Sequence, residues 1–158
     1  MERIPNDVED LWIANFEVVK KRDLVLKQQH SMKNLTIGIN ALHGVSMMEL
    51  NGLKSLERVV IMQGGLYDGN GRLRVMNCAN LSSIDMGEYA FMKYKNLELT
   101  NLPLLRSISI GNNAFQFIQT IVMESNIGYE MMNQTCQLFS RFNWEITPFK
   151  ETVVTNAR

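Results

Sequence analysis

The sequence predicts a mainly β, α/β-horseshoe-like solenoid of five turns, with a period of roughly 24 residues. Every turn is expected to contribute two short strands, one to each of two parallel ladders. Three observations support this: a motif that repeats at a fixed offset, apolar alternation inside each motif, and one extra residue in a connector. A repeat of this length with fixed apolar positions is typical of solenoids, in which each turn buries the face of its neighbour.

The clearest copies of the motif begin at Leu81 and Leu105. Leu81-Ser-Ser-Ile-Asp-Met-Gly-Glu-Tyr-Ala-Phe91 returns as Leu105-Arg-Ser-Ile-Ser-Ile-Gly-Asn-Asn-Ala-Phe115. A shorter motif, Leu97-Glu-Leu99, returns as Ile121-Val-Met123 at the same offset. The corresponding apolar positions of the three earlier turns are Val8, Leu11, Ile13 and Val18, then Met32, Leu35, Ile37 and Leu42, then Leu56, Val59, Ile61 and Leu66. The predicted turns are 8–31, 32–55, 56–80, 81–104 and 105–128.

Each motif alternates apolar and polar residues over a few positions, which favours a strand. The alternative is a helical array, but no turn has apolar residues at helical spacing over a sufficient length. The third period is longer than the others by a single residue. This residue is assigned to the connector 67–72, where Asp68-Gly69 and Asn70-Gly71 are turn dipeptides. Deletion of one residue within Gly69–Arg72 is therefore expected to be nearly neutral.

The two ends of the predicted solenoid differ. Residues 1–128 form the solenoid, 129–150 are either a degenerate repeat or a C-terminal capping helix, and 151–158 are a flexible tail. No comparable cap precedes Val8, so the first turn is expected to be covered by a partner or by further turns of a longer array. An exposed strand edge favours pairing, and weak self-association through residues 8–26 is expected.

Composition excludes several classes of function. Basic and acidic residues balance at 16 each, which argues against a nucleic-acid partner. The sequence has no export signal and no apolar run long enough for membrane insertion, so it is expected to be cytoplasmic as written, or extracellular if it is a fragment of a longer surface protein. Two cysteines and two histidines without metal-ligand spacing predict no cofactor and no metal.

Written as a template, the turn is L-x-x-L-x-L-x-x-N-x-L/F, which resembles the conserved segment of leucine-rich repeats. The segment Ile110-Gly-Asn-Asn-Ala-Phe115 resembles the BspA-like subgroup, found in surface and cell-interaction proteins of bacteria and protists. The chain departs from this family at the asparagine position, which only Asn40 and Asn113 keep; the resemblance implies a side-chain ladder that is interrupted in the other turns. A second polar column after the second strand is expected to close turns instead.

In leucine-rich repeats, the outward residues of the first strand form the concave binding face. The resemblance thus implies a protein-binding surface on this column. Its members are Asp10, Trp12, Asn34, Thr36, Arg58, Val60, Met62, Ser83, Asp85, Ser107 and Ser109. Trp12 is the strongest candidate because aromatic and Arg anchors dominate protein interfaces. The alternative for Trp12 is an edge residue that packs under a neighbouring repeat.

The remaining polar residues are assigned structural roles. Arg74 is expected to lie between Glu49 and Glu98 in the outward column of the second strand, in a cross-strand ion pair or a solvated row. Cys78 falls in a core column, which argues against a nucleophile, and His30 and His43 are expected to be solvated. These assignments predict a non-enzymatic protein-binding scaffold. The alternatives are a structural spacer within a larger repeat protein, and an enzyme with a hidden site.

Overall fold

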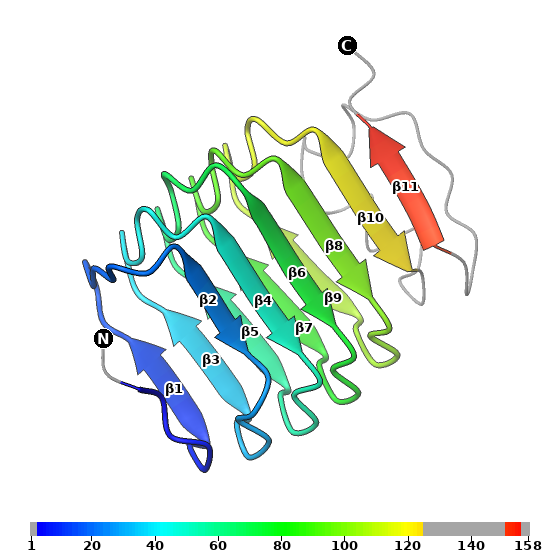
Figure 1. Cartoon of the computed structure of the whole chain (residues 1–158). Helices are drawn as coiled ribbons and strands as arrows, with labels where there is room; N and C mark the ends of the chain where they lie inside the picture. Colours follow the sequence, from blue (N-terminus) through cyan, green and yellow to red (C-terminus); the bar gives the residue numbers. More distant parts are fainter. Residues whose placement is uncertain (1–2, 125–150, 156–158) are drawn as a thin grey trace.

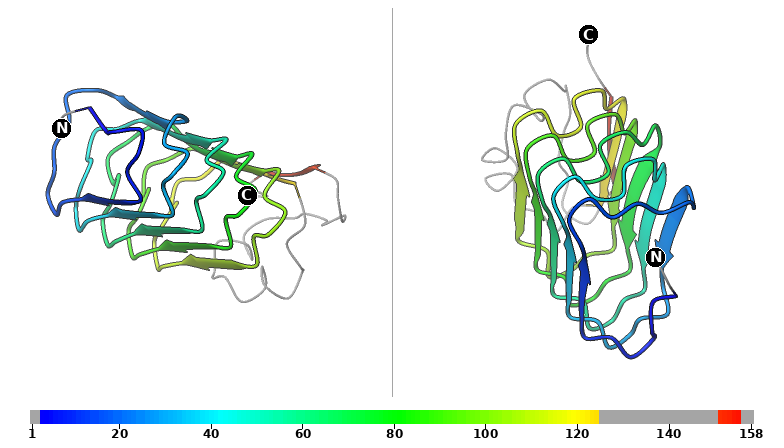
Figure 2. Two further views of the ribbon diagram at one scale, coloured as in Figure 1. Left: turned by 90° about the horizontal axis from the view of Figure 1, so that it is seen from below. Right: turned by 90° about the vertical axis from the view of Figure 1, so that its left-hand side faces the viewer.

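The computed structural model describes residues 3–124 and 151–155, and within this part the chain forms two sheets that face each other (Figures 1 and 2). Sheet A contains β1 (Asp10–Ile13), β3 (Asn34–Ile37), β5 (Arg58–Ile61), β7 (Ser83–Met86) and β9 (Ser107–Ile110), in that order. Sheet B contains β2 (Asp23–Leu26), β4 (Met47–Asn51), β6 (Arg72–Met76), β8 (Asn96–Thr100), β10 (Thr120–Glu124) and β11 (Glu151–Thr155). The described residues contain no helix.

The strand register confirms the predicted solenoid. In sheet A, Asp10 pairs with Asn34, and Ser83 pairs with Ser107, in parallel and at the offset that the sequence repeat predicts. Between β5 and β7 the offset is longer by a single residue, because Arg58 pairs with Ser83. Each turn thus stacks directly on the next, and successive strands along the chain alternate between the sheets.

Alternation along each strand directs every second side chain into the space between the sheets. In β7, for example, Ile84 and Met86 are buried while Ser83 and Asp85 keep partial exposure. Large side chains fill the interior beyond the strands: the rings of Phe91 and Phe115 stack at 5.0 Å. This core is continuous along the solenoid, because equivalent residues of successive turns contact one another.

The loop after each strand of sheet A contains a residue with positive φ at the position where the template has asparagine. These residues are Phe16, Asn40, Gly64, Tyr89 and Asn113, with φ between 52° and 70°. The backbone N–H of Asn40 donates to Gln63 O, and that of Tyr89 donates to Asn112 O. These backbone hydrogen bonds therefore link successive turns whichever side chain is present. The missing asparagine side chains interrupt the side-chain ladder that the resemblance implies, but not this backbone ladder.

The extra residue of the third turn is Asn70. Pairing of Met47 with Arg72 gives the longer offset in sheet B, whereas Leu66 still follows Leu42 at the common offset and shares its positive φ. Gly69 occupies the buried position of this loop, since an added Cβ would meet Val45 O and the ring of Tyr94. Gly71 is equally restricted, by the backbone of Ser46. The predicted tolerance to deletion is therefore confined to the exposed Asn70.

Tyr94 fills the space that Gly69 leaves. Its ring is fully buried against Phe91, with centroids 4.9 Å apart at 74°, and its hydroxyl donates to Val45 O two turns away. Burial raises the pKa of Tyr94, and the nearby charge of Asp23 raises it further, so the hydroxyl stays protonated as a donor.

The first turn departs from the predicted core. Val18, expected inside, is 75% exposed, and Val19 packs against the core in its place. Val8 and Leu11 are only partly buried. Within the described residues this turn has a neighbouring turn on one side only, so its loop is not held in the register of the others.

At the opposite end, part of the predicted flexible tail is ordered as a strand. Glu151–Thr155 forms β11, which pairs antiparallel with β10 and adds a sixth strand to sheet B. An unpaired edge of β10 offers backbone donors and acceptors to any neighbouring segment, which accounts for this addition. The predicted degenerate repeat or capping helix at 129–150 lies outside the described residues.

Phe115→Ala should lower the free energy of unfolding by about 3 to 5 kcal/mol, because the ring is fully buried in the stack with Phe91. Phe117→Ala is the matched control. Its ring is 46% exposed, so a loss below about 1 kcal/mol is expected. Urea titrations of both variants measure the difference, and equal losses would show that the register is wrong.

Deletion of Asn70 should leave the melting temperature nearly unchanged, because it restores the common offset and removes an exposed residue. Deletion of Gly69 gives a loop of the same length but places Asn70 against the Tyr94 ring, and it should be clearly destabilising. Deletion of Ser83 is the control for a register shift within a strand and should abolish cooperative unfolding. If thermal melts of the Asn70 and Gly69 deletions coincide, this assignment of the insertion is incorrect.

Candidate protein-binding face

The outer face of sheet A presents two straight columns of side chains. Parallel register aligns Asp10, Asn34, Arg58, Ser83 and Ser107 in one column and Trp12, Thr36, Val60, Asp85 and Ser109 in the other. We call these ten residues the sheet A face. Neighbouring strands of a sheet are about 4.8 Å apart, so residues within each column are adjacent. The structure thus brings together ten of the eleven predicted face residues.

Met62 is the residue that does not belong to this face. It follows the end of β5, at the position that Gly38, Gly87 and Gly111 occupy in other turns, and its backbone N–H donates to Ile37 O. At these three glycines the chain is too close to the preceding turn for a side chain, since a Cβ on Gly87 would lie 2.7 Å from Gln63 N. Met62 is therefore a loop residue at the margin of the sheet A face.

The sheet A face combines one large aromatic side chain with small and polar ones. Trp12 is 66% exposed and lies beside Thr36. Two polar links cross between strands: Asn34 Nδ2 donates to Asp10 Oδ1 at 2.7 Å, and the Arg58 guanidinium lies 3.4 Å from Asp85 Oδ2. A ligand that approaches this face would therefore meet an exposed indole at one end and mostly small, polar side chains along the rest.

Two further exposed aromatic side chains lie in the loops that follow sheet A. Phe16 is 67% exposed and Tyr89 is 37% exposed, and both have positive φ, a conformation that is unfavourable for bulky residues. Sequence reasoning treated them only as departures from the asparagine position. The sequence did contain a signal for exposed aromatic side chains. An aromatic residue at a surface position that favours asparagine or glycine gains no stability from packing, so its presence there points to another role.

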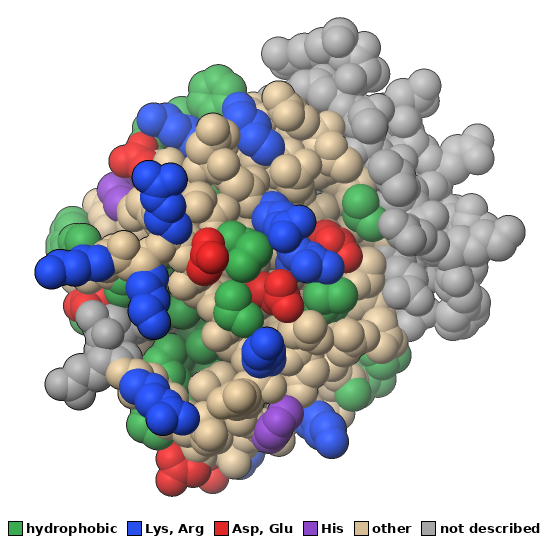
Figure 3. Space-filling model, viewed as in Figure 1, with side chains coloured by type: hydrophobic (Ala, Val, Ile, Leu, Met, Phe, Trp, Pro, Cys, Tyr) green, Lys and Arg blue, Asp and Glu red, His purple; other side chains and the backbone are tan. Residues whose placement is uncertain are grey.

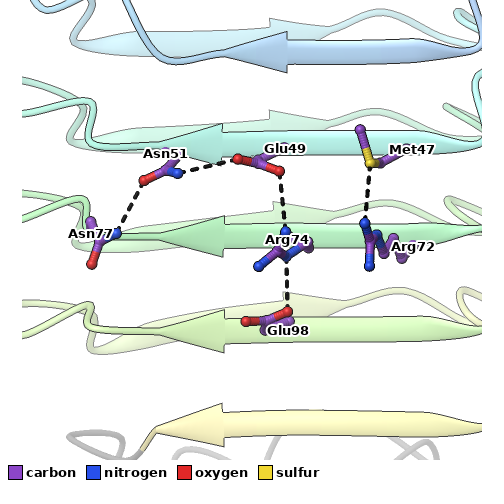
Figure 4. Close-up of polar contacts among 7 residues, drawn as sticks. All are labelled: Met47, Glu49, Asn51, Arg72, Arg74, Asn77 and Glu98. Carbon is purple, nitrogen blue, oxygen red and sulfur yellow. Dashed lines mark hydrogen bonds and ion pairs between the residues drawn. The ribbon is translucent and has the colours of Figure 1, made fainter.

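The outer face of sheet B is organised around an ion triad. Arg74 Nε donates to Glu98 at 2.9 Å, and its Nη1 lies 3.4 Å from Glu49 (Figure 4). The predicted position of Arg74 between two glutamates is confirmed. The three side chains are only 15 to 29% exposed, which reduces screening by solvent relative to a surface pair.

Amide side chains form a second row on sheet B: Asn77 and Asn101 follow β6 and β8 in the expected polar column, whereas Asn51 is the last residue of β4. Asn101 Nδ2 donates to Asn77 Oδ1 at 2.9 Å, and Asn77 Nδ2 donates to Asn51 Oδ1 at 3.1 Å. Figure 3 shows basic, acidic and apolar side chains interspersed over the middle of this face. Because so many of its polar groups already bond to one another, sheet B has less to offer a partner than the sheet A face.

Residues with chemical reactivity are separated from one another. Cys78 is fully buried, its thiol donates to Met76 O, and burial raises its pKa, which disfavours the nucleophilic thiolate. His43 is exposed, as expected, but its ring also stacks on Tyr67 and lies 3.8 Å from Asp68, which pairs with Lys93 at 3.2 Å. These contacts hold the connectors of successive turns against one another. In the described part of the chain, no nucleophile adjoins His43.

Within residues 3–124 and 151–155, no three His, Cys, Asp or Glu side chains converge as metal ligands would. The same part of the chain contains no helix that could span a membrane.

Comparisons of the chain with protein-family models, with curated proteins and with solved structures find no match. The class defined by the fold alone is a repeat solenoid with two parallel sheets.

Arg74→Met should lower the free energy of unfolding by about 1 to 2 kcal/mol, because it removes two ion pairs and leaves partly buried carboxylates without a partner. Arg58→Met is the matched control. It breaks a longer pair whose side chains are 60% and 36% exposed, and it should cost no more than about 0.5 kcal/mol. Denaturant titrations at low and high salt compare the variants; a loss at Arg74 no larger than at Arg58 would contradict a role of the triad in stability.

Proposed function

We propose that the protein is a non-enzymatic interaction module that binds another protein through the sheet A face. The observation that carries this proposal is the exposure of Trp12, at 66%, on an otherwise regular sheet. Tryptophan is the side chain most enriched among residues that dominate binding energy, and leaving it in water forgoes the gain from burial. A partner that covers it recovers this gain.

The geometry of the sheet A face suits a protein ligand better than a small molecule. Its residues lie on five parallel strands in straight register, which gives an extended surface and not a concave pocket. Thr36, Val60 and Ser109 are short, so a partner can approach the strands closely. Phe16 adds a second aromatic anchor in the same turn as Trp12. Aromatic residues are enriched at protein interfaces, and the rim of an interface is polar.

The resemblance to leucine-rich repeats, and to their BspA-like subgroup, supports the same proposal. The Gly-x-x-Ala-Phe segment has a defined packing role, since Ala114 and Phe115 are buried and a Cβ on Gly111 would lie 2.5 Å from Glu88 N. In the proposed assignment, sheet A is the strand ladder that this family uses for protein recognition. Fold resemblance alone does not identify the partner.

A structural spacer is the second candidate, and one observation favours it. The charged and amide groups of the sheet A face are partly satisfied within the face, through Asn34 with Asp10 and Arg58 with Asp85. A surface whose polar groups bond internally attracts partners less strongly. In this case Trp12 would pack against a neighbouring repeat.

The two candidates can be separated by photo-crosslinking in the source cells. A photoreactive residue at Thr36 reports on the sheet A face, and the same residue at Thr100 of β8 is the matched control on sheet B. The binding proposal predicts a discrete crosslinked partner from Thr36 that disappears with Trp12→Ala and is absent from Thr100. Crosslinking from neither position, or equally from both, would support the spacer.

With the purified partner, Trp12→Ala should weaken the affinity by about 30-fold or more, which corresponds to roughly 2 kcal/mol for a dominant aromatic anchor. The melting temperature of the free protein should not fall, because the indole is largely exposed. Titration calorimetry measures the affinity, and a thermal melt is the control. An affinity unchanged within about twofold would remove Trp12 from the interface.

A further inference from the structure

The amino-terminal end of sheet B carries an unpaired strand edge. In the described residues β2 is hydrogen-bonded to β4 and to no strand on its other side (Figure 2, right). The carbonyl of Arg22 accepts bonds from β4, and the alternation of a parallel strand then directs the backbone N–H of Val25 away from β4. The edge of β2 thus presents free backbone groups in the geometry that a further strand requires.

A pocket with a mixed polar and apolar lining lies directly beside this edge. Its volume is about 640 Å³, and the apolar part of its lining comes from Ile4, Val18, Val19, Leu24, Val25 and Leu26. Leu24 and Leu26 are the inward residues of β2, so the pocket continues the hydrophobic core beyond this edge strand. A strand added to β2 would direct alternate side chains into this space.

The charges around the pocket favour an acidic occupant. Arg3, Lys20 and Lys21 line it together with a single acidic residue, Asp23. No ion pair joins these three cations to any residue in the part of the chain that the structure describes. A second copy of the chain is a poorer occupant, because a two-fold interface places the same patch on both sides and would bring these cations together.

We propose that the β2 edge binds an extended segment of another protein by strand addition, and that this segment has apolar residues at alternate positions flanked by Asp or Glu. The backbone pairs with β2, the apolar side chains fill the pocket next to Leu24 and Leu26, and the carboxylates lie near Lys20 and Lys21. This site is separate from the sheet A face and does not depend on it. Backbone pairing supplies affinity, while the pocket and its cations supply selectivity.

The test uses the full chain and two labelled synthetic peptides, EEVTVTVEE and its basic counterpart KKVTVTVKK. Fluorescence anisotropy should detect binding of the acidic peptide and little or none of the basic one. The double variant Lys20→Glu, Lys21→Glu should weaken acidic-peptide binding by about tenfold or more and favour the basic peptide, because it reverses the charge at the pocket. Lys54→Glu, an exposed lysine in another turn, is the matched control and should bind like the unmodified protein.

A second variant separates strand addition from simple charge attraction. Val25→Pro removes the outward N–H of β2 without removing a bond to β4, and it should abolish binding of the acidic peptide while thermal melting stays cooperative. Peptide binding that Val25→Pro or the lysine double variant leaves unchanged would overturn the proposal, as would no binding of the acidic peptide. Sedimentation of the free chain tests the other occupant: a dimer that Val25→Pro dissociates would assign the edge to a second copy and overturn it as well.

Discussion

In-register stacking of each turn on the next is the constraint on which the rest of this protein depends. A residue's neighbours in space are those one period away in the chain, so a property repeated at that interval becomes a continuous column. The buried ladder that contains Ile84 and Ile108, the amide row through Asn77 and the backbone bonds of the loops all arise in this way. The same constraint prevents any turn from burying its core alone.

A turn can depart from the common length where a specific contact compensates for the lost packing. The longer third turn places Gly69 where the preceding turn has Val45, which would leave a void in the core. Tyr94 fills that space from the following turn and donates its hydroxyl to Val45 O, so one aromatic side chain connects three turns. The first turn has no such compensation, and it contains Trp12, Phe16, Val18 and Val25, four of the large apolar side chains that the described part exposes to solvent. Both proposed interaction surfaces begin in this turn.

Period and alternation alone predicted the turns, both sheets, the buried columns and the position of Arg74, because these follow directly from which residues stack. The role of Tyr94 could not be predicted, since it depends on the space beside a glycine in another turn. Val18 was assigned to the core by analogy with Leu42, but an end turn lacks the second neighbour that enforces register. The pairing of His43 with Asp68 was missed because the two residues meet only across adjacent connectors.

The measurement that tests the stacking register most directly is a methyl-resolved NOE experiment on the isotopically labelled protein. In-register stacking predicts cross-peaks between methyl groups of Ile84 and Ile108, which pair across β7 and β9, and between those of Leu97 and Ile121 across β8 and β10. Each pair is buried, and the two residues lie on adjacent strands whose backbones are about 4.8 Å apart, so the cross-peaks should be strong. Absence of both cross-peaks in the folded protein would contradict the stacking of one turn on the next.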